Sequence, residues 1–434
     1  MSIEKTENIP SESDKITMSH YILLAMLTML NILSIVDRQL LSSFANYVVP
    51  DLNLSNTEFG LLTGLVFMVF YSFMALIMGA LADIYHRPRL ISAAVFLWSL
   101  CTAASGAAKG FFSLAIPRML IGVGESTLAP SAISMLADKF PASKRGLASG
   151  IYYTGVSIGL GVSLLIAGYL GPVIGWRMCF YLLGGIGVIL SIAVLFITEV
   201  PRRASNEIGA QQKKQNIKTK LVGLFLALKS SPALCMTIIG GTCVHIMFGA
   251  TTFDQLWYVQ ERGYDRALIA QTTGWFGVLG GVTGNLVGGL GSDYWHKITG
   301  KSRLSFLLIV MIMLAPINIY YRIADPGTFF FWLGVFFTFF QLGLSYGPVY
   351  ATIQELAPPQ VCSTVVAFNI LMASVVGVGF SITASGILID YFIGLQLAEP
   401  YTWSLLVFTV LSMTCIPAFY FAMKLHHKTG LYSD

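Results

Sequence analysis

The stretch Gly79-Ala-Leu-Ala-Asp83-Ile-Tyr-His-Arg87-Pro-Arg89 lies between two long apolar runs. Its order of residues, a glycine, an acid four positions later and then cations, recurs in Gly289-Leu-Gly-Ser-Asp293-Tyr-Trp-His-Lys297. Repeated halves are a common plan of polytopic membrane proteins, and repeated halves place similar loops at corresponding positions. The repeat therefore predicts a chain built from two similar halves.

Composition on either side of these loops indicates a membrane protein. The chain has 434 residues, of which 55% are hydrophobic and 11% charged, whereas about a quarter of the residues in soluble domains are charged. The apolar runs are long enough for helices that cross the bilayer and too long for barrel strands. We predict an all-α membrane protein with twelve transmembrane helices, at about 20–48, 56–82, 90–109, 112–137, 146–171, 176–198, 232–259, 267–291, 304–322, 328–354, 362–390 and 401–424.

The distribution of lysine and arginine predicts the orientation. An even number of crossings places both termini on one side, and most cations fall in the loops of that side. Cytoplasmic loops are enriched in Lys and Arg, so both termini are expected in the cytoplasm. We expect five parts: a cytoplasmic N-terminal segment (1–19), an N-terminal six-helix bundle (20–198), a polar cytoplasmic linker (199–231), a C-terminal six-helix bundle (232–424) and a cytoplasmic tail (425–434).

Several classes of function are disfavoured by what the sequence lacks. The cations, which give a net charge of +5, are spread over many loops and do not predict a nucleic-acid surface. The sequence has neither a Gly-Lys-Ser/Thr phosphate loop nor the motifs of intramembrane enzymes, so no enzyme is expected. Six cysteines lie singly in apolar runs, and we predict no disulfide, metal site or cofactor: Cys101, Cys179, Cys235, Cys243, Cys362 and Cys415.

Three charged residues fall near the middle of two predicted spans. Asp37 and Arg38 lie in the first span and Glu125 in the fourth, at matching depths. Ionisable residues are costly in hydrocarbon, so they usually face a cavity or a partner and serve function. Adjacent helix positions point in different directions, and we expect Arg38 to face Glu125. Glu125 is then the candidate proton carrier, with Arg38 and Asp37 as its partners in coupling; a static ion pair for Arg38–Glu125, and a supporting hydrogen-bond role for Asp37, are the alternatives.

Other embedded residues allow two interpretations each. Arg118 lies two turns before Glu125 and either binds an anionic head group, together with Arg38 and Glu125, or snorkels and bonds to carbonyl groups. In the seventh span, Asp254 either closes an outer gate or has no such role, and His245 is more often a satisfied packing histidine than a functional one.

These motifs resemble the major facilitator superfamily. The loop Gly79–Arg89 resembles the signature loop of this superfamily, except at Ile84 and His86. The span-four motif of the superfamily resembles Arg118-Met-Leu-Ile-Gly122-Val-Gly124-Glu125. The start of span six resembles Gly175-Trp176-Arg177. More narrowly, Asn31-Ile-Leu-Ser-Ile-Val-Asp37-Arg38 with Gly122-Val-Gly-Glu125 is similar to the spinster branch, in its bacterial form.

The resemblance implies a secondary active transporter that works by alternating access. It further implies a lipid-like substrate of the lysophospholipid or sphingolipid class, moved with protons; a proton symporter for a small organic anion is the runner-up, and a non-transporting membrane sensor is the alternative of another class. Membrane lipids, an amphiphilic substrate and protons are the expected partners, the chain is expected to be a monomer, and a bacterial inner membrane is the expected location. The expected gating residues are Asp83, Arg87, Arg145, Asp293 and Asp254.

Overall fold

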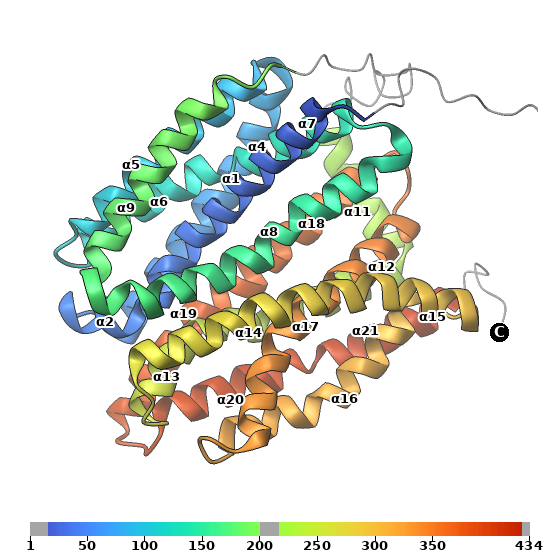
Figure 1. The fold of residues 1–434 in the computed structure, drawn as a ribbon. Coiled ribbons are helices and arrows are strands. Elements are labelled where there is room, and N and C mark those ends of the chain that lie inside the picture. The colour runs from blue at the N-terminus through green and yellow to red at the C-terminus, as the bar shows by residue number, and fades with distance from the viewer. Residues whose placement is uncertain (1–15, 200–216, 428–434) are drawn as a thin grey trace, which may run out of the picture.

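A computed structural model describes residues 16–199 and 217–427, and these residues form helices joined by short loops, without strands. Figure 1 shows two groups of long helices, one coloured blue to green and the other yellow-green to red, with α8 and α14 side by side where the groups meet. The N-terminal group contains α1 (Met18–Ser43), α2 (Ala45–Asp51), α3 (Asn56–Thr63), α4 (Leu65–Ile84), α5 (Arg87–Gly106), α6 (Phe111–Glu125), α7 (Leu128–Lys139), α8 (Ala142–Tyr169) and α9 (Gly171–Val194).

The C-terminal group follows the same plan with more interruptions. It contains α11 (Ile217–Ser230), α12 (Pro232–Ala250), η2 (Thr251–Phe253), α13 (Asp254–Gln260), α14 (Arg266–Leu286), η3 (Val287–Gly291), α15 (Ser292–Thr299), α16 (Arg303–Ile323), α17 (Phe329–Leu356), α18 (Cys362–Leu371), η4 (Met372–Phe380), α19 (Ser381–Gly394), α20 (Pro400–Ser412) and α21 (Cys415–His427).

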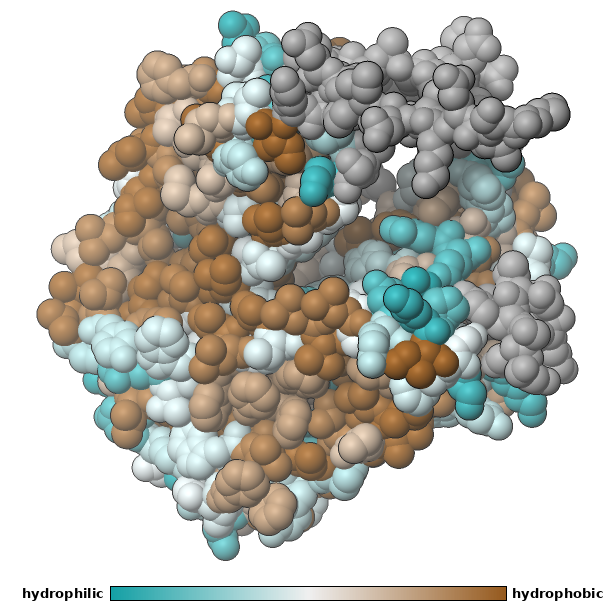
Figure 2. Space-filling model, turned by 45° about the vertical axis from the view of Figure 1, so that its right-hand side comes forward, coloured by the Kyte–Doolittle hydropathy of each residue, from teal (hydrophilic) through white to brown (hydrophobic). Residues whose placement is uncertain are grey.

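In the part of the chain that the structure describes, eleven helical segments are long and apolar enough to cross a membrane. Their apolar side chains are exposed around the molecule, and Figure 2 shows hydrophobic residues covering much of its flank. The remaining predicted span, the eighth (267–291), corresponds to α14 and η3. It is helical as expected, but its glycine, threonine and glutamine residues make it less apolar than the other spans. The prediction of an all-helical, many-span membrane fold is therefore confirmed.

The segment between the halves is described only in part. Of the predicted linker 199–231, residues 200–216 lie outside the described residues, and α11 occupies 217–230 and contacts α12 and α18. Residues 1–15 of the predicted N-terminal segment and 428–434 of the predicted tail also lie outside the described residues. The domain boundaries stay predictions.

Breaks within the spans position the residues discussed below. The second span is divided at Gly64, whose backbone is not helical, so that α3 forms a separate outer cap. Ser55 and Glu58 begin α3 with a reciprocal capping box. The fourth span is interrupted directly after Glu125, and η4 in the eleventh span has the wide turns of a π-helix.

The main contacts between the two halves lie along two sides of the molecule. α8 packs on α14 along one side of the molecule, and α3 and α4 pack on α19 and η4 along the other. Between these contacts lies a space that reaches the inner ends of α8 and α17, where it is lined by Ser149 and Gln354. Figure 2 shows the hollow between the halves on the face that comes forward.

Candidate functional site

The space between the halves is a cavity of about 740 Å³. Small-molecule sites commonly have volumes of about 300–1,000 Å³ and combine apolar walls with a few polar groups. The N-terminal half contributes Arg38 and Glu125 together with other hydrogen-bonding groups, such as Asn31. The C-terminal half contributes a comparable set of polar groups, including Asp254 and His245. Apolar side chains complete the wall of the C-terminal half, among them Phe248, Phe339, Leu342, Val366 and Ile370.

Arg38 and Glu125 face each other at the wall of this cavity, as predicted. The Arg38 guanidinium donates hydrogen bonds from Nε (3.1 Å) and Nη2 (2.8 Å) to Oε2 of Glu125. The Arg38 side chain keeps 19% of its surface exposed, whereas that of Glu125 is fully buried. Arg38 also lies 4.5 Å from the ring centre of Tyr71, a favourable cation–π distance. The pair is thus reachable from the cavity through the arginine.

The Gly-x-Gly-Glu sequence explains how Glu125 reaches this position. A Cβ at Gly124 would lie 3.0 Å from the carbonyl oxygen of Ala94, so glycine allows α6 to approach α5 closely. Glu125 is the last residue of α6, and only one of its carboxylate oxygens is bonded; Oε1 is buried and has no hydrogen-bond partner within the described part of the chain. The carboxylate therefore has a free acceptor beside its ion pair.

Asp37 and Arg118 lie behind the pair. Asp37 is 1% exposed, does not line the cavity, and turns toward Trp98 and Thr102 of α5. Arg118 is also 1% exposed and donates from Nη2 to the carbonyl oxygen of Arg38 (3.2 Å). These contacts match the interpretation in which Arg118 bonds to carbonyl groups. The carbonyl group belongs to the neighbouring helix α1. The roles of Asp37 in proton coupling and of Arg118 in substrate binding stay predictions.

A second buried ion pair occupies the C-terminal half. Nη1 of Arg322 donates to Oδ1 of Asp254 (2.7 Å), and the arginine side chain is fully buried while that of Asp254 is 10% exposed. The guanidinium lies between the rings of Trp257 (4.8 Å) and Tyr321 (4.5 Å). The predicted span 304–322 ends at Arg322, and the sequence analysis did not select this residue for the site. In the structure α16 continues to Ile323, and the aromatic rings shelter the charge. Asp254 lines the cavity near its outer end.

Polar contacts hold the outer ends of the two halves together. The carboxylate of Asp390 in α19 accepts hydrogen bonds from the backbone nitrogen and Nδ2 of Asn56 (3.2 and 2.8 Å) and from the backbone nitrogen and hydroxyl of Thr57 (2.7 and 2.6 Å). We call Asn56, Thr57 and Asp390 the outer latch. Asn46 adds a hydrogen bond to the Gln255 carbonyl oxygen (2.7 Å). The sequence analysis did not assign Asp390 a role, since its position alone does not reveal a partner in the other half.

Charged residues at the inner ends form networks within each half. Arg87 is fully buried, and it donates to Asp138 at the end of α7 (2.6 Å) and to Glu199 (2.7 Å). Two carboxylates therefore compensate the charge of Arg87 inside the bundle. Arg145 donates to the Phe140 carbonyl oxygen (3.2 Å).

In the repeated loop, Arg303 donates to Asp293 (2.7 Å) and contacts Glu355 of α17. The side chain of Asp83, which corresponds to Asp293, lies outside the described residues. The gating roles of Asp83, Arg87, Arg145, Asp293 and Asp254 stay predictions.

Comparisons with known proteins identify the family that the sequence matches. The model of the Major Facilitator Superfamily matches residues 27–381. The hexuronate transporter of Bacillus subtilis (strain 168) is 28% identical over 283 residues, 65% of this chain and 66% of that protein. Protein spinster of Drosophila melanogaster is 24% identical over 385 residues, 85% of this chain and 62% of that protein. The chain thus spans about two thirds of the length of these relatives.

A solved structure is similar in fold over nearly the whole chain. It is that of a bacterial homologue of the human lysosomal transporter Spinster, in an inward-facing and unoccupied conformation. The TM-score is 0.80 at 20% identity, and the match covers 95% of this chain and 99% of that one. The expected resemblance to spinster proteins is confirmed by both comparisons.

Proposed function

The chain belongs to the Major Facilitator Superfamily, and from that premise we propose that it is a secondary active transporter that moves an amphiphilic, lipid-like substrate together with protons. The observation that supports this most directly is the Arg38–Glu125 pair at the wall of a cavity of about 740 Å³. The family and the fold are those of membrane transporters rather than enzymes.

The geometry supports a coupling role for Glu125. In this form, Arg38 compensates the carboxylate charge through two hydrogen bonds. A carboxylate that is buried without a cation is more stable when protonated, whereas a neighbouring cation favours the charged form. Movement that separates Arg38 from Glu125 would therefore take up a proton, and their return to contact would release it. The exposed edge of Arg38 is where a substrate would compete for the guanidinium.

The cavity walls favour an amphiphile. Both walls combine polar groups with apolar side chains, among the latter Phe248, Phe339 and Leu342 of the C-terminal half. A molecule with a head group and a hydrocarbon chain can satisfy both walls at once. The similarity to spinster proteins supports the lipid-like class.

The second candidate is a proton symporter for a small organic anion. The similarity to the hexuronate transporter supports it, because a hexuronate is a small carboxylate that could bond to Arg38. We place either transporter in a bacterial inner membrane, with the termini in the cytoplasm.

The experiment is uptake by Glu125→Gln in liposomes under an imposed pH gradient, with lysophosphatidylcholine and glucuronate as the two test substrates. We expect the wild type to accumulate the lysolipid, and Glu125→Gln to bind it but to lose proton-driven accumulation. Asp325→Asn, the same change of carboxylate to amide at an exposed outer position, is the control. Normal proton-driven uptake by folded Glu125→Gln would reject the coupling role, and accumulation of glucuronate alone would select the second candidate.

A further inference from the structure

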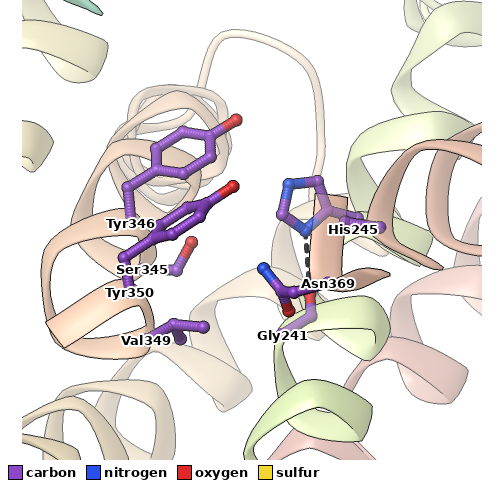
Figure 3. Close-up of a pocket in the computed structure, with 8 residues that line it drawn as sticks. Gly241, His245, Ser345, Tyr346, Val349, Tyr350 and Asn369 are labelled. Carbon is purple, nitrogen blue, oxygen red and sulfur yellow. Dashed lines mark hydrogen bonds between the residues drawn. The ribbon is translucent and has the colours of Figure 1, made fainter. Parts of the chain in front are cut away.

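His245 of α12 lines the same cavity as Arg38 and Glu125, on the opposite wall. Its ring is hydrogen-bonded along the helix: Nδ1 lies 2.8 Å from the carbonyl oxygen of Gly241, one turn earlier. Figure 3 shows this bond, and it shows the second ring nitrogen turned toward the side where Tyr346 and Tyr350 lie. The histidine is thus anchored by one nitrogen and presents the other.

The anchoring bond determines which nitrogen carries the proton in the neutral ring. A carbonyl oxygen can only accept, so Nδ1 must donate and therefore holds the hydrogen. Nε2 is then a bare acceptor in the neutral form. Protonation at Nε2 leaves the bond to Gly241 intact and converts the cavity-facing nitrogen into a charged donor. The ring can change its charge without moving.

The surrounding elements make room for the ring and supply hydroxyl groups. A Cβ at Gly377 in η4 would lie 2.6 Å from Cβ of His245, so glycine allows η4 to approach α12 closely beside the histidine. Tyr346 of α17 packs edge-on to the imidazole, with ring centres 5.8 Å apart, and Tyr350 stacks on Tyr346. Figure 3 shows both tyrosine hydroxyls extending from α17 toward the space before the histidine.

No carboxylate among the described residues forms an ion pair with this ring. The groups that face it are the hydroxyls of Tyr346 and Tyr350 from α17, the amide of Asn369 from α18, and the uncharged residues of η4. The charged side chains that line the same cavity, Arg38, Glu125 and Asp254, are held in ion pairs of their own. A protonated His245 would therefore be a buried cation in need of an anion.

We propose that Nε2 of His245, with the hydroxyls of Tyr346 and Tyr350, is a protonatable subsite for the anionic group of the substrate, a carboxylate or a phosphate. The proposal rests on the proposed transport function and adds a second group that binds a proton, in the other half of the chain. An anion beside Nε2 favours the imidazolium, and the imidazolium favours the anion, so each increases the affinity for the other. Arg38 already has Glu125 as its counterion, whereas His245 has none among the described residues.

The test is equilibrium binding by the purified full chain at pH 5.5 and pH 8. The probes are lysophosphatidate and glucuronate, each compared with its uncharged counterpart, monoacylglycerol of the same chain length and glucose. Every measurement is made in Glu125→Gln, whose amide removes the titration of that side chain. We expect at least one of the two anions to bind about tenfold more tightly at pH 5.5, because a charged donor replaces a bare acceptor, and the uncharged counterparts to show no such change.

Two substitutions separate the role of Nε2 from that of packing. His245→Asn retains a donor near the position of Nδ1 and removes the cavity-facing nitrogen, and His245→Gln places a neutral amide near Nε2. We expect the ratio of affinities at the two pH values to fall to less than about twofold in both. His296→Asn is the matched control, since Nδ1 of His296 also lies 2.8 Å from a carbonyl oxygen, that of Lys301, at an exposed site away from the cavity.

A pH ratio that persists in folded His245→Asn would overturn the proposal, and so would the failure of both anions to bind to Glu125→Gln and to the wild type. If Glu125→Gln does not fold, the same His245 variants in the wild-type chain are expected to reduce the ratio at least about threefold. A third outcome is that the His245 variants lose the pH ratio of affinities for glucuronate, while lysophosphatidate does not bind at all. This outcome supports the subsite and rejects the lipid-like substrate. Loss of the ratio with lysophosphatidate, combined with normal proton-driven uptake by Glu125→Gln, supports the subsite and rejects the coupling role of Glu125.

Discussion

The two halves of the molecule each contain a buried arginine–carboxylate pair, and the pairs differ in how the arginine is held. Arg38 keeps 19% of its side chain exposed to the cavity. Arg322 is fully buried between the rings of Trp257 and Tyr321, and Asp254 is its carboxylate partner. An exposed guanidinium can exchange its carboxylate for another anion, whereas an enclosed one cannot do so without disrupting its surroundings. An arginine–carboxylate pair therefore suits exchange of anions in the N-terminal half and structural support in the C-terminal half.

The largest effect is expected from breaking the enclosed pair. Arg322→Gln leaves Asp254 buried without its cation, and loss of one partner of a buried pair typically costs about 3–5 kcal/mol. We expect a marked fall in the midpoint of thermal unfolding in detergent. Adding Asp254→Asn should restore part of the loss, because no uncompensated charge remains. Equal losses in the single and the double variant would show that the pair is not a unit.

Arg38→Gln is expected to change the free energy of unfolding less than Arg322→Gln does, and to act mainly on transport. The variant loses two charge-assisted hydrogen bonds on the cavity wall, and we expect transport to fall about 100-fold, which corresponds to about 3 kcal/mol. The midpoint of unfolding should change less than in Arg322→Gln, since the cavity can hydrate Glu125. A larger loss of stability in Arg38→Gln than in Arg322→Gln would reverse the comparison between the pairs.

The outer latch tests whether the halves separate as units. Asp390→Ala removes the acceptor of four hydrogen bonds between α19 and α3, and we expect the equilibrium to shift toward an outward-open form by about 1–3 kcal/mol. Spin labels at Val173 and Phe329, both exposed near the outer ends of opposite halves, would report longer distances in a cysteine-free background. Unchanged distances in the folded variant would show that the packing of α8 on α14 suffices to close this end.

The smallest effect is expected outside the spans, at Asp51. The hydrogen bond from Arg177 holds the pKa of Asp51 below its ordinary range, and a second hydrogen bond from Trp176 contributes. A depressed pKa in the folded state adds stability above the unfolded-state pKa, and this stability is lost as the pH falls through the folded-state value. Both side chains are well exposed, so Asp51→Asn should cost less than about 1 kcal/mol at pH 7 and nothing measurable near pH 2. Comparing unfolding midpoints at the two pH values checks the sign.

Much of the fold follows from the sequence because membrane crossing imposes simple requirements. Long apolar runs predict the helices, and a second copy of the Gly-x₃-Asp loop pattern indicates the division into halves. The pairing of Arg38 with Glu125 is also predictable, because depth along a span can be counted and a charge at mid-membrane needs a partner. The breaks at Gly64 and after Glu125 are not predictable from apolarity, which is continuous through them.

Contacts between distant segments are what the sequence does not reveal. Asp390 bonds to Asn56 and Thr57, and Arg322 bonds to Asp254, across separations that no periodicity encodes. Arg87 is another example, since its burial depends on Glu199 at the far end of the same half. A clue was available for Arg322: the preceding tyrosines are unusual neighbours for a charge in an outer loop, and they shelter it in the structure.

The π-helical segment η4 has a further consequence for the eleventh span. Its turns contain more residues than those of an α-helix. The segment therefore sets how the outer part of the span, α19, is rotated about the helix axis relative to the inner part, α18. The segment η4 itself presents Gly377 to the histidine, and the outer part, α19, presents Asp390 to the opposite half. Deleting a residue from η4 would change this angular relation between α18 and α19. The two ends of the span would then face the wrong neighbouring helices, although every side chain at both ends would be unchanged.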